Sequence, residues 1–200
     1  MSKPVVITRE IIGEAALNMI RESGLDSISA RSIAERLGCS TQPIYKAYGS
    51  MKMLKEDTMA KLADFMMESI TSYKKTGSAF MDSGLGLIHF AKTEKVLFQL
   101  FCLDGKNHEL YRLAFVDKTI RKLMEEELPS QLLSKKSIDK MYFQTMVFTY
   151  GLAVLVFLGH LKLNENEIAE LLDETFESYL NQELEEKNEH YCTRGKPKGR

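Results

Sequence analysis

Apolar residues recur along this chain at the three- and four-residue spacing that places them on one face of a helix. In the first such segment, which begins near Thr8 and ends at Gly24, the recurring apolar residues are Ile12, Ala15, Ala16, Met19 and Ile20. No alternating pattern flanks a tight hairpin turn, and the Asp-Gly pair at residues 104–105 separates two helical patterns. The chain is therefore predicted to be all-α.

Two short helices joined by a glycine-centred turn are predicted to follow the first helix. Ser29 can cap the first of them and Gly38 can end it. Ser40 can cap the second, with Pro43 in its first turn, and Gly49 can end it. This is the arrangement of a helix-turn-helix, in which the second helix enters the major groove of DNA.

The remaining chain predicts a larger helical bundle. Ser50 can cap a long helix that reaches about Lys74, and the later patterns predict helices at residues 78–91, 94–102, 107–127, 136–161 and 165–187. We therefore expect three parts: a three-helix DNA-binding domain over residues 1–55, a larger bundle over 56–188, and a flexible tail over 189–200.

The distribution of charge supports a role for the first part. The 200 residues are 44% hydrophobic and 28% charged, which is ordinary for a globular protein, and the net charge is −1. Residues 1–55 hold eight Lys and Arg against five Asp and Glu, so this portion carries +3 and the remainder −4. A basic N-terminal portion on a slightly acidic body suggests that this portion meets a polyanion.

Outward-facing polar residues of the second short helix are candidates for contacting DNA. Gln42 can form two hydrogen bonds to adenine, and Lys46 favours guanine or phosphate, with Thr41 beside them. Phosphates can also be reached from Tyr45, Lys46, Lys52 and the helix N-terminal amides near Ser29 and Ser40.

These residues carry a resemblance to a known family. The segment 8–54 reads TREIIGEAALNMIRESGLDSISARSIAERLGCSTQPIYKAYGSMKML, and its matching pieces are Thr8-Arg9, Ala15-Ala16, Gly24, Arg31, Ala34, Leu37-Gly38, Ser40, Tyr45, Tyr48, Ser50 and Leu54. It resembles the DNA-binding domain of the tetracycline-repressor-like (TetR/AcrR) family of transcriptional regulators. The segment departs from the family's pattern at Gln42-Pro43, where Gly-Thr is usual, and at Met51, where Lys is usual.

The resemblance implies which residues meet an operator. It places Thr41, Gln42, Pro43, Tyr45 and Lys46 on the recognition helix and Arg31 on the helix before it. Tyr48 is also a DNA-binding candidate, although family aromatics at this position pack against the first helix. The implied partner is double-stranded DNA, bound by a homodimer.

A small effector is the other implied partner, and its binding would release a repressor from DNA. The sequence does not distinguish repressor from activator. We expect a mostly apolar effector, because the candidate lining residues are Phe90, Phe98, Phe101, Tyr111, Phe115, Tyr142, Met146 and Tyr150.

A dimer contact is expected from the last two helices. The 136–161 helix is too apolar to lie exposed on a soluble monomer, and the last helix carries its own apolar side. In the resembled family these two helices usually form the dimer contact, and the candidate residues are Leu155, Leu158, Ile168, Leu172 and Phe176.

One different interpretation stays open, and several classes of site are not expected. Residues 141–161 are uncharged and long enough to span a bilayer, so a helical adaptor or membrane-tethered protein is the alternative. No nucleotide-binding or hydrolase motif occurs, and the histidines lack metal-site spacing, so we expect no enzymatic activity, cofactor or metal. The three separate cysteines fit a reducing cytoplasm, and we expect a cytoplasmic protein without a membrane partner.

Overall fold

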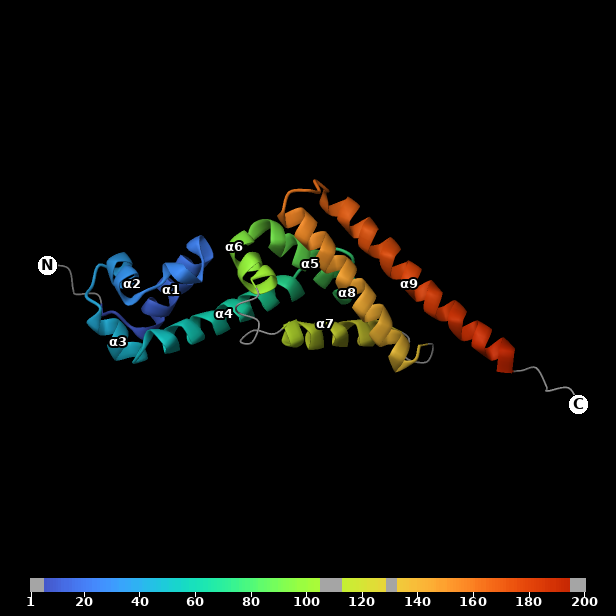
Figure 1. Ribbon diagram of the computed structural model, residues 1–200, viewed down its shortest axis with the longest axis horizontal. Helices are drawn as coiled ribbons and strands as arrows, with labels where there is room; N and C mark the ends of the chain where they lie inside the picture. Colours follow the sequence, from blue (N-terminus) through green and yellow to red (C-terminus); the bar gives the residue numbers. More distant parts are fainter. Residues whose placement is uncertain (1–5, 105–112, 129–132, 195–200) are drawn as a thin grey trace, which may run out of the picture. The chain divides into compact units, whose positions relative to one another are not determined.

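The computed structural model describes residues 6–104, 113–128 and 133–194, with side chains placed for 6–104, 118–128 and 133–185. Every regular element within these ranges is helical, which confirms the all-α prediction (Figure 1). The chain divides into two compact units. The first comprises Met1–Glu68 with Thr93–Leu113, and the second comprises Ser69–Lys92 with Ala114–Arg200.

The first unit holds the predicted helix-turn-helix. Its elements are α1 (Arg9–Ser23), the 3₁₀ turn η1 (Leu25–Ser27), α2 (Ala30–Leu37), α3 (Gln42–Tyr48), most of α4 (Met51–Thr71), α6 (Lys95–Phe98) and the π-helical turn η2 (Gln99–Leu103). The predicted domain boundary after residue 55 lies inside the continuous helix α4, and it stays a prediction.

Local signals in the sequence place the ends of the first helices correctly. Thr8 accepts a hydrogen bond from the amide of Ile11, 3.4 Å away, and α1 begins at the next residue. Gly38 ends α2 with φ of 63° and ψ of 33°, a left-handed conformation that any side chain would disfavour. Ser50 accepts a hydrogen bond from the amide of Met53, as expected of the residue before α4.

The prediction that Ser40 caps α3 is wrong by one residue. The N-cap is Thr41, and its side chain makes no capping hydrogen bond. Thr41 has φ of −73° and ψ of −14°, whereas a capping side chain requires the extended conformation that brings its oxygen to the next amides. Pro43 lies in the first turn as predicted, where its missing N–H costs nothing.

Apolar side chains of α1 form the centre of the first unit. Helix α1 contacts α2, α3 and α6. Ile12 and Ile33 are fully buried and Ile44 is 1% exposed, so α1, α2 and α3 each contribute one aliphatic anchor. Leu37, on the same helix as Ile33, is only half-buried. Arg21 on α1 forms an ion pair with Glu94, which attaches the segment before α6 to this core.

The second unit is a helical bundle. Its helices are α5 (Ala79–Thr93), α7 (Leu113–Glu127), α8 (Lys135–Phe157) and α9 (Glu165–Arg194). Helices α8 and α9 lie side by side and antiparallel (Figure 1). The ring centroids of Phe80 on α5 and Phe176 on α9 are 5.5 Å apart, and Leu172 is 2% exposed. Helix α5 is therefore packed against α9 through aromatic and aliphatic side chains.

Several helices end elsewhere than the sequence pattern predicts. Helix α4 ends at Thr71 rather than near Lys74, and α8 ends at Phe157 rather than at 161, because Gly159 adopts φ of 74°. The single helix expected over 94–102 is a short α-helix followed by a π-helical turn. Helix α9 continues to Arg194, beyond the predicted end at 187, and the last part of the expected tail, residues 195–200, lies outside the described residues.

Candidate nucleic-acid interface

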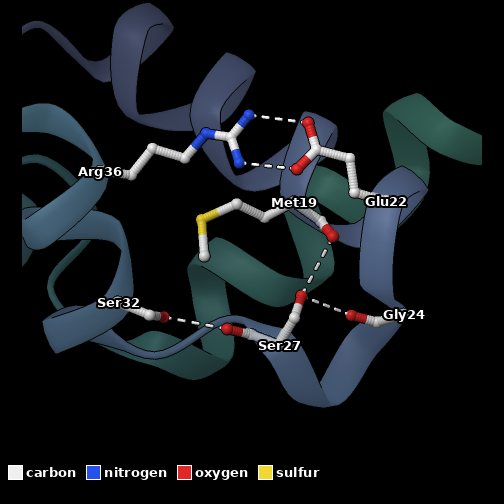
Figure 2. A network of polar contacts seen from close by, with 6 residues as sticks. All are labelled: Met19, Glu22, Gly24, Ser27, Ser32 and Arg36. Carbon is white, nitrogen blue, oxygen red and sulfur yellow. Dashed lines mark hydrogen bonds and ion pairs between the residues drawn. The ribbon is translucent and has the colours of Figure 1, made fainter.

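Helix α2 is fixed to α1 by polar contacts around the turn that joins them (Figure 2). The hydroxyl of Ser27 lies 2.6 Å from the carbonyl oxygen of Gly24 and 3.1 Å from that of Met19, and it can donate to either. Ser32 donates from its hydroxyl to the Ser27 carbonyl at 2.9 Å. These bonds join the end of α1, the η1 turn and the start of α2.

A bidentate ion pair closes the other side of this junction. Both terminal nitrogens of Arg36 lie 2.7 Å from the carboxylate oxygens of Glu22, so the planar guanidinium faces the carboxylate squarely (Figure 2). The hydrogen bond from Arg36 holds the pKa of Glu22 below its ordinary value. Both terminal nitrogens of Arg36 are therefore engaged by Glu22 of α1.

Ser29 makes a reciprocal capping box at the start of α2. Its hydroxyl oxygen accepts from the amide of Ser32 at 3.1 Å, and its own amide donates to the Ser32 hydroxyl at 2.8 Å. Ser29 is exposed, as is Arg31 two residues later. The start of α2 is thus rigidly defined, and a predicted contact residue projects from its first turn.

Helix α3 has one buried and one exposed face. Ile44 and Tyr48, one turn apart, are 1% and 2% exposed, and they anchor the helix on α1 and α2. Gln42 and Lys46 are exposed, and Tyr45 is 49% exposed, which is unusual for a large aromatic side chain. The helix thus presents an amide, a phenol and an ammonium group together on its outer side.

The other predicted contact residues near α3 divide by exposure. Ser40 and Thr41 are exposed, and Pro43 is half-buried. The Lys52 side chain, in the first turn of α4, is 84% exposed and its ammonium lies 3.9 Å from Glu56, too far for a strong pair. These residues and those of α3 come from one stretch of chain and lie at the surface of the first unit. Their roles in binding stay predictions.

Tyr48 differs from the other candidates because it is buried. Its hydroxyl lies 3.2 Å from the carbonyl oxygen of Arg9 and 3.1 Å from Oδ2 of Asp57. Burial raises the pKa of Tyr48, and the neighbouring Asp57 carboxylate raises it further. Tyr48 therefore lies among α1, α3 and α4, as expected of family aromatics that pack at this position.

The residues around the Tyr48 hydroxyl are absent from the sequence-based candidates. They are Arg9, Gly13, Asp57 and Lys61. The four-residue spacing of Asp57 and Lys61 could have indicated their ion pair. Nothing in the spacing of Arg9, Gly13 and Tyr48 indicates that they meet, because their contact depends on how α1 and α3 cross.

The candidate effector-lining residues fall into three groups. Phe90, Phe98 and Tyr142 are at most 3% exposed, and Phe101 is 9% exposed. Met146 is 37% exposed and Tyr150 half-buried. Tyr111 and the side chain of Phe115 lie outside the described residues. A lining role for any of them stays a prediction.

Two buried polar atoms in α8 were not among those candidates. Gln144 Oε1 and Thr145 Oγ1 are buried and have no hydrogen-bond partner among the side chains that the structure describes. Glu183 of α9 is 6% exposed, and its carboxylate lies 2.6 Å from the ammonium of Lys140 on α8. Gln144 and Thr145 are recognisable in the sequence as polar interruptions of an apolar stretch.

The residues predicted for a dimer contact differ in how far they are exposed. Leu155 and Leu158 on α8 are 40% and 53% exposed, whereas Ile168 and Leu172 on α9 are each 2% exposed and pack inside the second unit. Phe176 is half-buried against Phe80. The exposed large apolar side chains of α8 and the residue that follows it are Phe143, Met146, Val147, Leu155 and Leu158, and we call them the α8 stripe.

A metal site and a membrane span are two other classes of site to consider in the described part of the chain. No group of three His, Cys, Asp or Glu side chains there could hold a metal ion. Helix α8 is long and apolar enough to cross a membrane, and one third of its most apolar window is buried inside the protein. Length and composition alone are weak grounds for a span, because core helices share them.

Comparison with known proteins gives a consistent answer for the fold. No family model and no curated protein matches the sequence. A protein from Vibrio parahaemolyticus assigned to the TetR family of transcriptional regulators is similar in structure, with 17% identity, a TM-score of 0.59, and coverage of 85% of this chain and 97% of that one. A TetR-like transcriptional regulator from Rhodococcus sp. RHA1 shares 16% identity with a TM-score of 0.59, over 90% and 98% of the two chains.

A third solved structure, a TetR-family regulator from Rhodococcus sp., shares 14% identity with a TM-score of 0.61 over 86% and 97% of the two chains. At these identities the likeness shows the fold. The architecture implied by the sequence resemblance, an N-terminal helix-turn-helix and a C-terminal helical bundle, is confirmed over most of the chain.

Proposed function

We propose that this chain is a sequence-specific DNA-binding transcriptional regulator of the TetR family. The observation that carries the proposal is the outer face of α3, where Gln42, Tyr45 and Lys46 project from a helix whose opposite face is anchored by Ile44 and Tyr48. A short helix held in this way can enter the major groove with its polar side toward the base edges. The shared fold of TetR-family proteins supports the same function.

The exposed residues have different roles in this proposal. Gln42 reads a base, because its amide can pair bidentately with adenine. Lys46 and Tyr45 contact a base edge or phosphate, while Arg31 and Lys52 hold the backbone of the duplex on either side. The remaining candidates lie next to the bound duplex, and they are Ser29, Ser40, Thr41 and Pro43. Phosphate contacts add affinity without sequence preference, so specificity rests on Gln42 and on whichever of Lys46 and Tyr45 contacts a base edge.

Substitution of Gln42 and Lys46 separates these roles. Using a duplex enriched from a random pool by the wild-type protein, we expect Gln42→Ala to reduce discrimination at one base pair by about 1–3 kcal/mol. Lys46→Ala should reduce the salt slope of binding by about one unit if Lys46 meets phosphate. Lys122→Ala, which removes an exposed charge from α7, is the matched control and should change neither quantity.

Three results would contradict these roles. If Gln42→Ala weakens every duplex equally, Gln42 does not read a base. If Lys46→Ala leaves the salt slope unchanged, Lys46 makes no phosphate contact. If Lys122→Ala changes the slope as much as Lys46→Ala, the binding is diffuse electrostatic attraction to the whole chain.

A homodimer formed through the α8 stripe is part of the proposal. The stripe places five large apolar side chains on the surface of a single subunit, and several exposed apolar side chains on one helix favour a partner contact there. A β-carbon added at Gly151, in the same helix, would meet no atom of the described residues within 4 Å, which leaves room for another helix to approach. A two-fold axis would make the stripe its own partner.

Relief of DNA binding by a small, mostly apolar effector completes the proposal. The effector would bind the state that cannot hold DNA more tightly than the state that can, because only differential affinity shifts an equilibrium. Screening small molecules for release of the enriched duplex tests this directly. Release only by highly charged compounds would contradict an apolar effector. We propose a cytoplasmic regulator rather than an enzyme or a membrane-tethered adaptor.

A further inference from the structure

We propose that Asp57 is a positioning residue for DNA recognition, acting through the hydroxyl of Tyr48 to hold the end of α3 against α1 and α4. The inference rests on the proposed function. Asp57 lies on α4 and is not part of the outer face of α3, so its effect on DNA would pass through Tyr48.

The Tyr48 hydroxyl is the point where three helices meet. It lies 3.1 Å from Asp57 Oδ2 on α4 and 3.2 Å from the carbonyl oxygen of Arg9 at the start of α1. A phenol has one proton, so the hydroxyl donates to one of these acceptors or shares its proton between them. Because Tyr48 is the last residue of α3, this bond fixes that end of the helix.

Charged groups keep Asp57 in the form that accepts this bond. Lys61 Nζ lies 3.2 Å from Oδ2, and the Arg9 guanidinium lies 3.7 Å from Oδ1. Burial favours the neutral acid, but the hydrogen bonds from Lys61 and Tyr48 and the two positive charges outweigh it and lower the pKa of Asp57. The same guanidinium stacks 4.3 Å above the Tyr48 ring.

Gly13 leaves the space that the hydroxyl occupies. A β-carbon at this buried position of α1 would lie 2.9 Å from the Tyr48 hydroxyl oxygen and 3.3 Å from Lys61 Nζ. Any side chain here would displace the hydroxyl or the ammonium. The three helices therefore bring a glycine, a phenol and a carboxylate together at one point.

The consequence for recognition follows from the length of α3. The helix has seven residues, and its deeply buried side chains are Ile44 and Tyr48. Without the hydroxyl bond, the ring and Ile44 still hold the helix, but its rotation about them is less restricted. Two simultaneous hydrogen bonds from one amide side chain to a base tolerate little misplacement. Specific binding should therefore suffer more than non-specific binding.

Four variants test the inference. Tyr48→Phe removes the hydroxyl and keeps the ring, Asp57→Ala removes the acceptor, and Asp57→Asn keeps an oxygen that can accept the bond. Gly13→Ala displaces the hydroxyl without changing it. Asp64→Ala removes an exposed carboxylate from the same helix and is the matched control.

Each protein is titrated with a duplex enriched from a random pool by the wild-type protein and with a scrambled duplex of the same composition. We expect Tyr48→Phe, Asp57→Ala and Gly13→Ala to weaken binding to the enriched duplex about fivefold or more, with the scrambled duplex changed less than about twofold. The double variant Tyr48→Phe/Asp57→Ala should match the single variants, because both remove one bond. Asp57→Asn and Asp64→Ala should remain within about twofold of the wild type.

Other outcomes overturn the inference. Equal losses on both duplexes would show general destabilisation, and fully multiplicative losses in the double variant would show that Asp57 does not act through Tyr48. Amide hydrogen exchange of the free protein is a second measurement that needs no DNA. Faster exchange in α3 of Tyr48→Phe, with α1 unchanged, supports positioning, and exchange identical to the wild type contradicts it. If the wild-type protein enriches no duplex, the proposed function fails instead.

Discussion

The close approach of α4 to α5 gives a quantitative test of the packing in the second unit. Gly86 is a buried residue of α5, and a β-carbon at this position would lie 2.4 Å from the carbonyl oxygen of Ile70 and 3.0 Å from its Cα. Ordinary contacts begin at 3.4 Å, so the substitution Gly86→Ala requires the two backbones to separate by about 1 Å.

The expected effect combines a cost and a gain. Overpacking a buried contact costs about 1–3 kcal/mol, and a clash with backbone belongs at the upper end because backbone cannot rotate away. Replacing glycine by alanine inside a helix returns about 1 kcal/mol. We therefore expect Gly86→Ala to lower the free energy of unfolding by about 2 kcal/mol, which corresponds to a Tm about 4–8 °C lower for a chain of this size.

A matched substitution lies two residues away in the same helix. At Gly84 a β-carbon would lie 3.4 Å from Leu172 Cδ1 and 3.5 Å from Thr149 Cγ2, which are ordinary contacts. Gly84→Ala should therefore leave stability unchanged or raise it by up to about 1 kcal/mol. Urea unfolding followed by circular dichroism measures both. If the Gly86→Ala protein is as stable as the Gly84→Ala protein, the backbones of α4 and α5 do not approach each other as closely as described.

Three further outcomes are expected. Leu155→Arg places a charge in the α8 stripe and should raise the dimer dissociation constant at least about a hundredfold, measured by analytical ultracentrifugation, with each chain still folded; a persistent dimer would place the interface elsewhere. Burial raises the pKa of Cys102 to about 12, so a variant that keeps only this cysteine should react with a thiol reagent at pH 8 only after unfolding; rapid reaction of the folded protein would contradict its burial. Burial opposes ionisation of Asp82, but hydrogen bonds from the Thr76 amide and hydroxyl and from neighbouring amides lower its pKa. Its contribution to the free energy of unfolding is thus present above about pH 4 and lost as the pH falls further. Asp82→Asn should therefore reduce the loss of stability on acidification, and an unchanged loss would contradict this role for Asp82.

Local signals made the first unit largely predictable. Ser29 and Gly38 act on backbone within three or four residues, so their effect on α2 can be inferred from the sequence without knowing the fold. The exposed position of Gln42 and Lys46 follows from the helical spacing of the buried Ile44 and Tyr48. The prediction of Ser40 as the N-cap of α3 failed because the N-cap is Thr41, whose backbone angles are already helical and are not specified by the sequence.

Contacts that depend on how helices cross were not predictable. Tyr48 meets Arg9, 39 residues away, and Asp57, nine residues away, at a point that no periodic pattern marks. The clash at Gly86 depends on the path of the Ile70 carbonyl. On α8 and α9 the apolar residues were recognised, but which of them face solvent was not, because α8 has apolar residues on several sides and the apolar side of α9 packs inside the second unit. Leu155 is exposed and Leu172 buried for this reason.

The central claim is that the chain recognises specific DNA, and one measurement tests it most directly. The purified wild-type protein is incubated with a pool of random duplexes, the bound fraction is amplified and sequenced over several rounds, and the mass of protein on the enriched duplex is measured. We predict enrichment of two inverted half-sites bound by about 46 kDa of protein, twice the 22.8 kDa chain. A pool that stays random, with binding that disappears at moderate salt, would contradict the claim.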